Sequence, residues 1–148
     1  MRLTIYTDYT LRTLMFLALC PERLVTVAEI AETYNISENH ITKVVHQLGV
    51  AGDVRTIRGR FGGMRLAKRP EALNLGTVVR RTEPDFAIAA CFDNRDACPL
   101  QAACVLEKAL AAAAAAFLAV LDHYTLADLI APHKKLQRAL GLVPLGLP

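Results

Sequence analysis

Residues 26–67 read TVAEIAETYNISENHITKVVHQLGVAGDVRTIRGRFGGMRLA, and the order of elements within this stretch decides the fold. The stretch begins with a T-x-x-E capping box, in which Thr26 and Glu29 satisfy free backbone N–H groups at the start of a helix. This capping box predicts a helix over residues 27–34. Asn35 follows it, and asparagine suits the left-handed residue that ends a helix.

A second helix follows after a tight turn. Ser37 is a good N-cap, and the helix expected over residues 38–49 has its buried stripe at Ile41, Val44, Val45 and Leu48. Two short helices joined in this way form a helix-turn-helix, whose second helix enters the DNA major groove. The side chains that we expect to contact DNA here are Thr26, Ser37, Asn39, His40, Thr42, Lys43, His46 and Gln47. An ordinary amphipathic helical hairpin would show the same pattern, so this segment alone does not decide between the two.

The next segment favours DNA binding. Residues 54–57 and 64–67 are strand-like, and the RGRFGG between them contains glycines that permit a turn with positive φ. The result is a β-hairpin with Arg58 and Arg60 at its tip, and a basic hairpin directly after a helix-turn-helix is a winged helix. Arginines at such a tip suit the minor groove, where the potential is most negative. Arg65, in the second strand, completes the set of wing residues that we expect to contact DNA.

Charge is distributed unevenly along the chain. Residues 1–70 hold ten Lys/Arg and six Asp/Glu, a net of +4, whereas residues 71–148 hold seven and eight, a net of −1. Within residues 51–70 six basic residues stand against the single acid Asp53. Such a segment is typical of a polyanion-binding surface, although a solvated loop would have the same composition.

A helix is also predicted upstream of this stretch, over residues 7–20. Thr7 would be its N-cap, and Asp8 would lie in its first turn. Cys20 closes the helix, and we interpret it as a small buried hydrophobe. The chain contains no run of 18 or more apolar residues, and polar residues stand where a signal peptide needs an apolar stretch. We therefore expect a cytoplasmic protein.

Downstream of the wing, a long helix is predicted. Asn74 would first cap a short helix over residues 75–83. The long helix would then run from Pro99, a good first helical residue, to about His123. At 1.5 Å per residue, about 24 residues span roughly 36 Å. A helix of that length with an apolar face usually packs against a partner, and the natural partner is the same helix in a second copy.

Three cysteines lie close together, with the spacing Cys91-x6-Cys98-x5-Cys104. In a cytoplasmic protein such a cluster favours metal binding or redox chemistry over a disulfide framework. Three thiolates suit zinc or an iron–sulfur cluster. The polar loop between the first two cysteines argues against unligated thiols packed in a core. The fourth ligand stays open, and the candidates are His123, Glu83, Asp93, Asp96, Glu107 and a residue of a second subunit.

Together these segments resemble a known family, the iron–sulfur winged-helix transcription regulators, which has NsrR-like and IscR-like branches. The resemblance rests on the opening MRLTIYTDYTLR, on TVAEIAETYNIS and NHITKVVHQL, and on the wing RTIRGRFGGMRL. It also rests on C-x6-C-P-L-x3-C, which leads into a helix that ends LDHYTLADL. These motifs cover nearly the whole chain.

The resemblance implies a homodimer with an iron–sulfur cluster in each subunit, held by Cys91, Cys98 and Cys104. In the NsrR-like branch an aspartate near the start of the first helix reaches across the dimer as the fourth ligand, and Asp8 stands at that position. In the IscR-like branch a histidine three residues past the last cysteine has this role, and Glu107 stands there. The resemblance therefore favours the NsrR-like branch, which senses nitric oxide, with a 4Fe-4S cluster favoured over 2Fe-2S.

The predicted fold class is mainly α with a small β-wing: a winged helix-turn-helix domain and a long C-terminal dimerisation helix. Residues 1–83 would bind DNA, residues 84–104 would form the cluster-binding loop, and residues 99–131 would hold the dimerisation helix and a short helix. Residues 132–148 would form a tail.

The predicted function is a repressor that binds a palindromic operator in double-stranded DNA, under the control of a cluster that senses nitric oxide. Three alternatives stay open: a zinc- or thiol-redox-responsive regulator, a regulator of iron–sulfur cluster assembly, and a cluster carrier without DNA function. We predict no enzymatic activity, because the sequence has no Gly-rich phosphate loop, no H-E-x-x-H motif and no nucleophile with an evident base.

Overall fold

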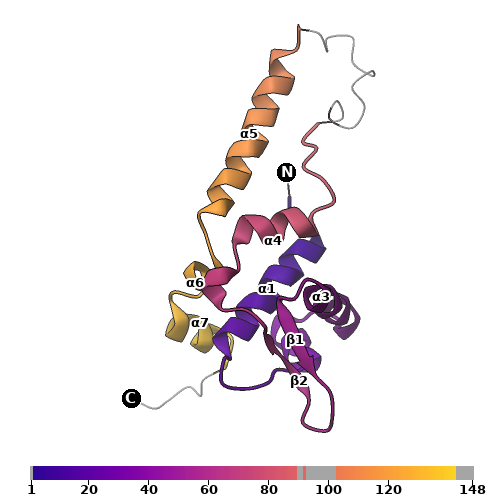
Figure 1. Cartoon of the computed structure of the whole chain (residues 1–148), viewed down its shortest axis with the longest axis vertical. Coiled ribbons are helices and arrows are strands. Elements are labelled where there is room, and N and C mark those ends of the chain that lie inside the picture. Colours follow the sequence, from indigo (N-terminus) through magenta and orange to yellow (C-terminus); the bar gives the residue numbers. More distant parts are fainter. Residues whose placement is uncertain (1, 90–91, 93–102, 143–148) are drawn as a thin grey trace.

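A bundle of helices with one two-stranded hairpin makes up the described part of the chain (Figure 1). The computed structural model describes residues 2–89, 92 and 103–142. The elements are α1 (Ile5–Leu19), α2 (Val27–Tyr34), α3 (Glu38–Val50), β1 (Val54–Ile57), β2 (Gly63–Leu66), the 3-10 helix η1 (Pro70–Ala72), α4 (Leu75–Thr82), α5 (Val105–Asp122), α6 (Leu126–Leu129) and α7 (His133–Ala139). The predicted fold class, mainly α with a small β-wing, is confirmed.

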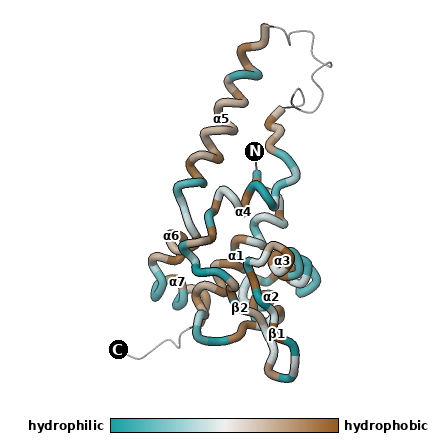
Figure 2. Tube along the Cα trace, in the orientation of Figure 1, coloured by the Kyte–Doolittle hydropathy of each residue, from teal (hydrophilic) through white to brown (hydrophobic). Residues whose placement is uncertain are grey.

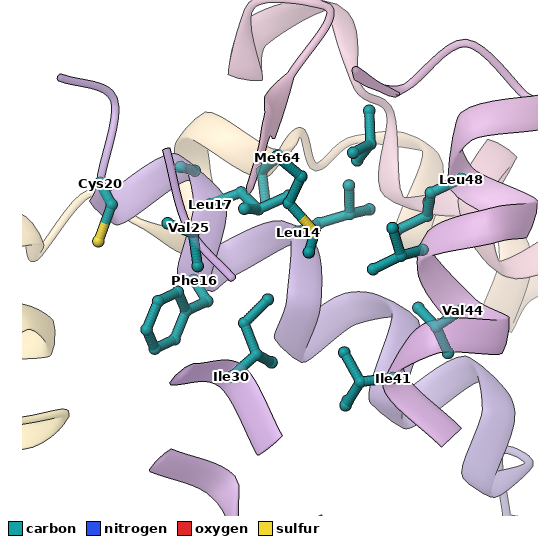
Figure 3. Packing of buried hydrophobic residues seen from close by; sticks show 14 of the residues in the cluster. Leu14, Phe16, Leu17, Cys20, Val25, Ile30, Ile41, Val44, Leu48 and Met64 are labelled. Carbon is teal, nitrogen blue, oxygen red and sulfur yellow. The ribbon is translucent and has the colours of Figure 1, made fainter. Parts of the chain in front are cut away.

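Helix α1 supplies the centre of the hydrophobic core. Its Leu14, Phe16 and Leu17 are buried among apolar side chains of α2, α3, the hairpin and the segment before α2 (Figure 3), namely Val25, Ile30, Ile41, Val44, Leu48 and Met64. Full burial of a Leu, Ile or Phe side chain stabilises a fold by about 1.5–3 kcal/mol. The predicted stripe of α3 is therefore the surface that fixes this helix against α1, and its polar side faces outward.

Both predicted ends of α2 and the predicted start of α3 are confirmed, and α3 ends at Val50, one residue beyond the predicted end. The side chain of Thr26 accepts the N–H of Glu29, whose carboxylate accepts the N–H of Thr26 at 2.7 Å. Asn35 has a left-handed backbone with φ of 51°. Ser37 caps α3 through the N–H of His40. Local sequence signals thus determine how the helix-turn-helix begins and ends.

The start of α1 differs from the prediction. Its N-cap is Thr4 and not Thr7, because the hydroxyl of Thr4 accepts the N–H of Thr7 at 3.2 Å. Thr7 is buried, and its hydroxyl donates to Thr82 of α4 at 2.8 Å. Both residues are good caps by type, and the contact with α4, which is distant in sequence, decides between them.

The long helix is shorter than predicted. Helix α5 has 18 residues and begins at Val105, and Cys104 before it has an extended backbone as the N-cap. Its length is therefore about 27 Å. Pro99 lies outside the described residues, but the prediction of one continuous helix from Pro99 was wrong, because the cysteine that ends the motif caps the helix instead of lying inside it. At the other end His123 is the C-cap, as the sequence predicted.

Helix α4 joins α5 to the rest of the molecule. Arg80 of α4 forms an ion pair with Asp122 of α5, with N–O distances of 2.5 and 2.7 Å. Asn74 caps α4 as predicted, and its amide also donates to the carbonyl of Asp122 at 2.8 Å. The N-terminal end of α5 projects away from this junction (Figure 1).

The base of the hairpin is also tied to α4. Asp53, just before β1, is 1% exposed and forms ion pairs with Lys68 after β2 and with Arg81 of α4. A buried carboxylate needs such partners, because an unpaired buried charge is strongly destabilising. The single acid of the basic segment is thus a structural anchor of the wing.

Two further findings concern the remaining helices. Helix α7 lies within residues 132–148, which the sequence predicted as a tail, and its Gln137 donates to the carbonyl of Leu19 at 2.8 Å.

Among the described residues no helix has the length and apolar character needed to cross a membrane.

Candidate DNA interface and metal site

The outer face of α3 carries the predicted recognition residues. Asn39, Thr42, Lys43, His46 and Gln47 are all exposed, whereas the apolar stripe of α3 is buried. Amide, hydroxyl and ammonium groups at these positions can reach base edges or phosphates. The structure therefore gathers these predicted side chains on one accessible helix face.

Thr26, Ser37 and His40, which were also predicted to contact DNA, make contacts within the protein. Thr26 and Ser37 are exposed, and each uses its side-chain oxygen to accept a backbone N–H at the start of a helix. The hydroxyl of Ser37 also lies 3.0 Å from Nδ1 of His40, whose ring centroid is 5.8 Å from that of Tyr9 in α1. The N-terminal turn of α3 is thus oriented by its own cap and by α1.

The wing presents four exposed arginines. Arg58 and Arg60 lie in the loop between β1 and β2, and Arg65 pairs with Arg55 across the antiparallel hairpin. Like charges in directly opposite positions of a hairpin are destabilising. Within the described residues none of the four forms an ion pair with a carboxylate, although Arg12, Arg23, Arg80 and Arg81 all do. An unneutralised basic ribbon of this kind suits a polyanion.

Arg55 is a candidate DNA contact that the sequence prediction missed. The prediction considered the tip of the hairpin and Arg65, but not the residue that lies opposite Arg65. The predicted strand boundaries 54–57 and 64–67 would have placed Thr56 opposite Arg65. The observed register, in which Ile57 pairs with Gly63, identifies Arg55 instead.

One of the three clustered cysteines lies within the described residues. Cys91 and Cys98 fall outside them. Cys104 is partly exposed and caps α5, with its Sγ accepting the N–H of Glu107 at 3.4 Å. Hydrogen bonds to the sulfurs are among the features that tune an iron–sulfur cluster. A soft sulfur donor with an N–H partner, accessible at the end of a helix, fits the role of a cluster ligand.

Cys20 has the opposite environment. It closes α1, belongs to the hydrophobic core and is 9% exposed. Burial raises the pKa of its thiol, so the reactive thiolate is disfavoured there. The interpretation of Cys20 as a small buried hydrophobe is confirmed.

The described candidates for the fourth ligand lie in different parts of the molecule. His123 and Cys104 flank opposite ends of α5, about 28 Å apart at 1.5 Å per residue, so they cannot share one site within a subunit. Glu83 uses one carboxylate oxygen to accept the N–H and the hydroxyl of Thr4, at 2.8 and 3.0 Å. Asp93 and Asp96 lie outside the described residues.

Asp8 lies in the first turn of α1, and its side chain is 46% exposed. Its carboxylate is 2.9 Å from Nε of Arg12, one helical turn later. The guanidinium of Arg12 in turn lies 5.6 Å from the ring centroid of Tyr34 in α2. Among the described residues of one chain, no group of three or more His, Cys, Asp or Glu side chains could hold a metal ion.

Known proteins that are similar to this chain are transcriptional regulators. A family model described as Rrf2, iron-dependent transcriptional regulator, matches residues 3–132. A Bacillus subtilis (strain 168) protein named HTH-type transcriptional regulator NsrR is 51% identical over 144 residues, which cover 96% of this chain and 99% of that protein. A protein of the same name from Halalkalibacterium halodurans is 47% identical over 146 residues, with 97% and 100% covered.

Two solved structures share the fold. The global cysteine regulator CymR of B. subtilis matches with a TM-score of 0.72 and 28% identity, over 88% of this chain and 97% of that chain. IscR of T. potens matches with a TM-score of 0.72 and 23% identity, over 99% of this chain and 94% of that chain.

Proposed function

Because the chain belongs to the Rrf2 family of iron-dependent transcriptional regulators, we propose that it is a repressor whose operator binding is controlled by an iron–sulfur cluster that senses nitric oxide. Its family makes it a DNA-binding transcription regulator and not an enzyme. The observation that carries the finer proposal is the match to the NsrR-named regulators over nearly the whole chain. A DNA-binding regulator acts where the DNA lies, and we place this one in the cytoplasm.

The DNA side of the proposal rests on two surfaces. The exposed face of α3 would enter the major groove, and the unpaired arginines of the wing would follow the backbone into the adjacent minor groove. One recognition helix per subunit requires two half-sites, so the proposed partner is a palindromic operator bound by a homodimer.

The metal side rests on the donor set. Cys91, Cys98 and Cys104 of one subunit and Asp8 of the partner subunit would hold the cluster. When bound, the cluster supplies iron that nitric oxide binds, and a carboxylate oxygen is a poorer match than sulfur for iron in such a site. Of these residues, Cys104 caps α5 and is partly exposed.

Helix α1 provides a physical route from this site to DNA. Asp8 lies in its first turn, and the same helix packs its buried side against Ile41 and Val44 of α3. Glu83, the residue before the predicted cluster-binding loop, binds Thr4, the N-cap of α1. A change in what Asp8 binds therefore acts on the helix that positions the recognition helix, which is the coupling between two sites that allostery requires.

The proposal is tested on the full chain purified without oxygen. We expect a coloured protein with acid-labile sulfide that binds an operator selected from a random duplex pool, and that releases it when nitric oxide is added. A colourless protein with bound zinc would favour a zinc-responsive regulator, and loss of DNA binding on mild oxidation alone would favour a thiol switch. Coloured protein that never binds DNA would favour a cluster carrier.

Asp8→Ala tests the fourth ligand. If Asp8 binds the partner's cluster, we expect a changed visible spectrum, faster loss of colour in air and weaker operator binding, because the bond between the two subunits is lost. If Asp8 only pairs with Arg12, the change costs about 0.3–0.5 kcal/mol of stability, as for an exposed pair one turn apart. Visible absorption and gel shift measure the difference.

Arg12→Ala is the matched control for this experiment. It removes the same ion pair but leaves the carboxylate of Asp8 in place. We therefore expect its visible spectrum to match the wild type. An unchanged spectrum and unchanged operator affinity in Asp8→Ala would rule out the cross-subunit ligand.

A further inference from the structure

The tip of the wing is a tight turn with two unlike side chains at its centre. The N–H of Gly62 donates to the carbonyl of Gly59 at 2.9 Å, which closes a four-residue turn. Arg60 and Phe61 occupy its two central positions and are therefore the outermost residues of the hairpin. The wing loop lies at the end of the molecule opposite to the projecting end of α5 (Figure 1).

Phe61 is the feature of this turn that the basic wing does not explain. It is 87% exposed, which is more than any of the other large exposed hydrophobic residues among the described ones. An exposed phenylalanine adds no stability to the folded monomer, because a side chain of this kind stabilises a fold only when it is buried, by about 1.5–3 kcal/mol. Its ring is within reach of one cation, because the guanidinium of Arg60 lies 5.7 Å from the ring centroid.

The surroundings of Phe61 indicate what kind of partner covers it. Arg55, Arg58 and Arg65 lie on the same hairpin, and within the described chain no carboxylate pairs with them. An apolar protein surface would leave these charges without counterions, whereas DNA neutralises them. Proteins that bind the minor groove often insert an apolar wedge such as Phe between base pairs, next to arginines that read the groove.

We propose that Phe61 enters the minor groove together with Arg60 and wedges against a base step, so that it is a specificity-determining residue of the wing. This inference rests on the proposed binding of DNA by the wing. A wedge unstacks the step that it touches, and pyrimidine–purine steps such as TA and CA are the easiest to unstack. Phe61 would therefore select such a step at the position that the wing faces, without a hydrogen bond to a base.

The hairpin holds Phe61 in a fixed position, as a wedge requires. A Cβ atom at Gly62 would collide with the carbonyl oxygen of Ile57, and one at Gly63 would lie 2.8 Å from the carbonyl oxygen of Val25. The start of β2, next to the wing loop, is bonded to Val25 through both backbone groups of Met64, at 2.7 and 3.0 Å. These close backbone contacts restrict the loop, so that Phe61 has little freedom to rotate away from the groove.

The test compares Phe61→Ala, Phe61→Leu and Arg58→Ala in the full-length, cluster-loaded protein. The probe is a duplex that the wild-type protein selects from a random-sequence pool. For Phe61→Ala we expect affinity to fall about tenfold, as when an aromatic that stacks on a base is removed, with the salt dependence unchanged. For Arg58→Ala we expect the salt dependence to flatten by roughly one unit of slope, because one phosphate contact is lost. Phe61→Leu should retain most of the affinity, since leucine also acts as a wedge.

A second readout isolates the sequence preference. Repeating the selection with Phe61→Ala should lose the enrichment of pyrimidine–purine steps at the wing positions and keep the major-groove part of the site. Tyr124→Ala, which truncates another exposed aromatic residue outside both the wing and α3, should leave both affinity and preference unchanged.

The outcomes distinguish failure of the Phe61 wedge from failure of the proposed DNA-binding function. Unchanged affinity and unchanged selected sequence in Phe61→Ala would overturn the wedge while leaving DNA binding by the wing intact. A wild-type protein that selects no sequence from the pool would contradict the proposed function itself.

Discussion

Replacing Cys104 with serine is expected to give a colourless protein that no longer responds to nitric oxide. A serine oxygen is a poor substitute for a soft thiolate as a ligand of an iron–sulfur cluster. The same substitution should leave the start of α5 intact, because Cys104 is its N-cap and serine is among the best N-cap residues. Loss of colour can therefore be assigned to the missing ligand and not to a disrupted helix. Visible absorption, iron and sulfide content and the far-ultraviolet helix signal measure both parts.

Cys20→Ser is the matched control for this experiment. Cys20 lies in the hydrophobic core at the end of α1, so a serine there should cost about 1–3 kcal/mol from a buried hydroxyl and keep the cluster. Cys91→Ser and Cys98→Ser should behave as Cys104→Ser does. If Cys104→Ser stayed coloured, or if Cys20→Ser lost its colour, the ligand assignment would be wrong.

Local signals made the DNA-binding half of the fold predictable. The capping box at Thr26, the left-handed Asn35 and the cap at Ser37 each act within a few residues, and the structure has all three. The period of the apolar residues then determined which side of α3 is buried. The wing followed from its glycines and its charge.

Contacts between distant residues explain what the sequence did not predict. Thr4 and Thr7 are equivalent as local caps of α1, and the bond of Thr7 to Thr82 distinguishes them. Asp53 is merely one acid among basic residues in the sequence, but in the structure it joins Lys68 to Arg81. Neither partner could be inferred from spacing, because each lies at least 15 residues away.

The candidate metal site was predicted from residue types and resemblance, and it is less accessible to local reasoning than the fold. The pattern of cysteines identifies soft ligands, yet a start of the long helix at Pro99 would have put Cys104 inside it. The alanine-rich sequence favours helix throughout this region. The cap at Cys104 overrides that preference, since its sulfur and the N–H of Glu107 pair at the helix end.

A further large effect is expected from a carboxylate placed on the exposed side of α5. All but three of the 18 residues of this helix are apolar, none of them is fully buried within the chain, and the helix is mostly hydrophobic along its length (Figure 2). Phe117 lines a pocket together with Leu3 and Phe86, so one side of the helix already faces its own chain. An exposed stripe recurs at intervals of three and four residues, the spacing of a helix–helix contact, at Leu106, Ala109, Ala113, Ala116 and Val120.

Ala113→Glu should therefore prevent the proposed dimer. A two-fold interface contains each substitution twice, and burying an unpaired carboxylate costs several kcal/mol. We expect a monomer by analytical ultracentrifugation. A monomer has one recognition helix in place of two, so operator affinity should fall on the order of 10³-fold, towards the non-specific level.

Ala115→Glu is the matched control, because it makes the same chemical change two residues later, on the face of α5 that already carries Lys108. Both sites are exposed in one chain, and both exchange one strong helix former for another, so the isolated helix should tolerate either change equally. Residues two apart point to different sides of a helix, and only the first lies on the apolar stripe. We expect Ala115→Glu to remain a dimer with near wild-type operator affinity. Dimeric Ala113→Glu protein with full affinity would show that the stripe is not the subunit contact, and equal loss in both variants would point to helix destabilisation instead.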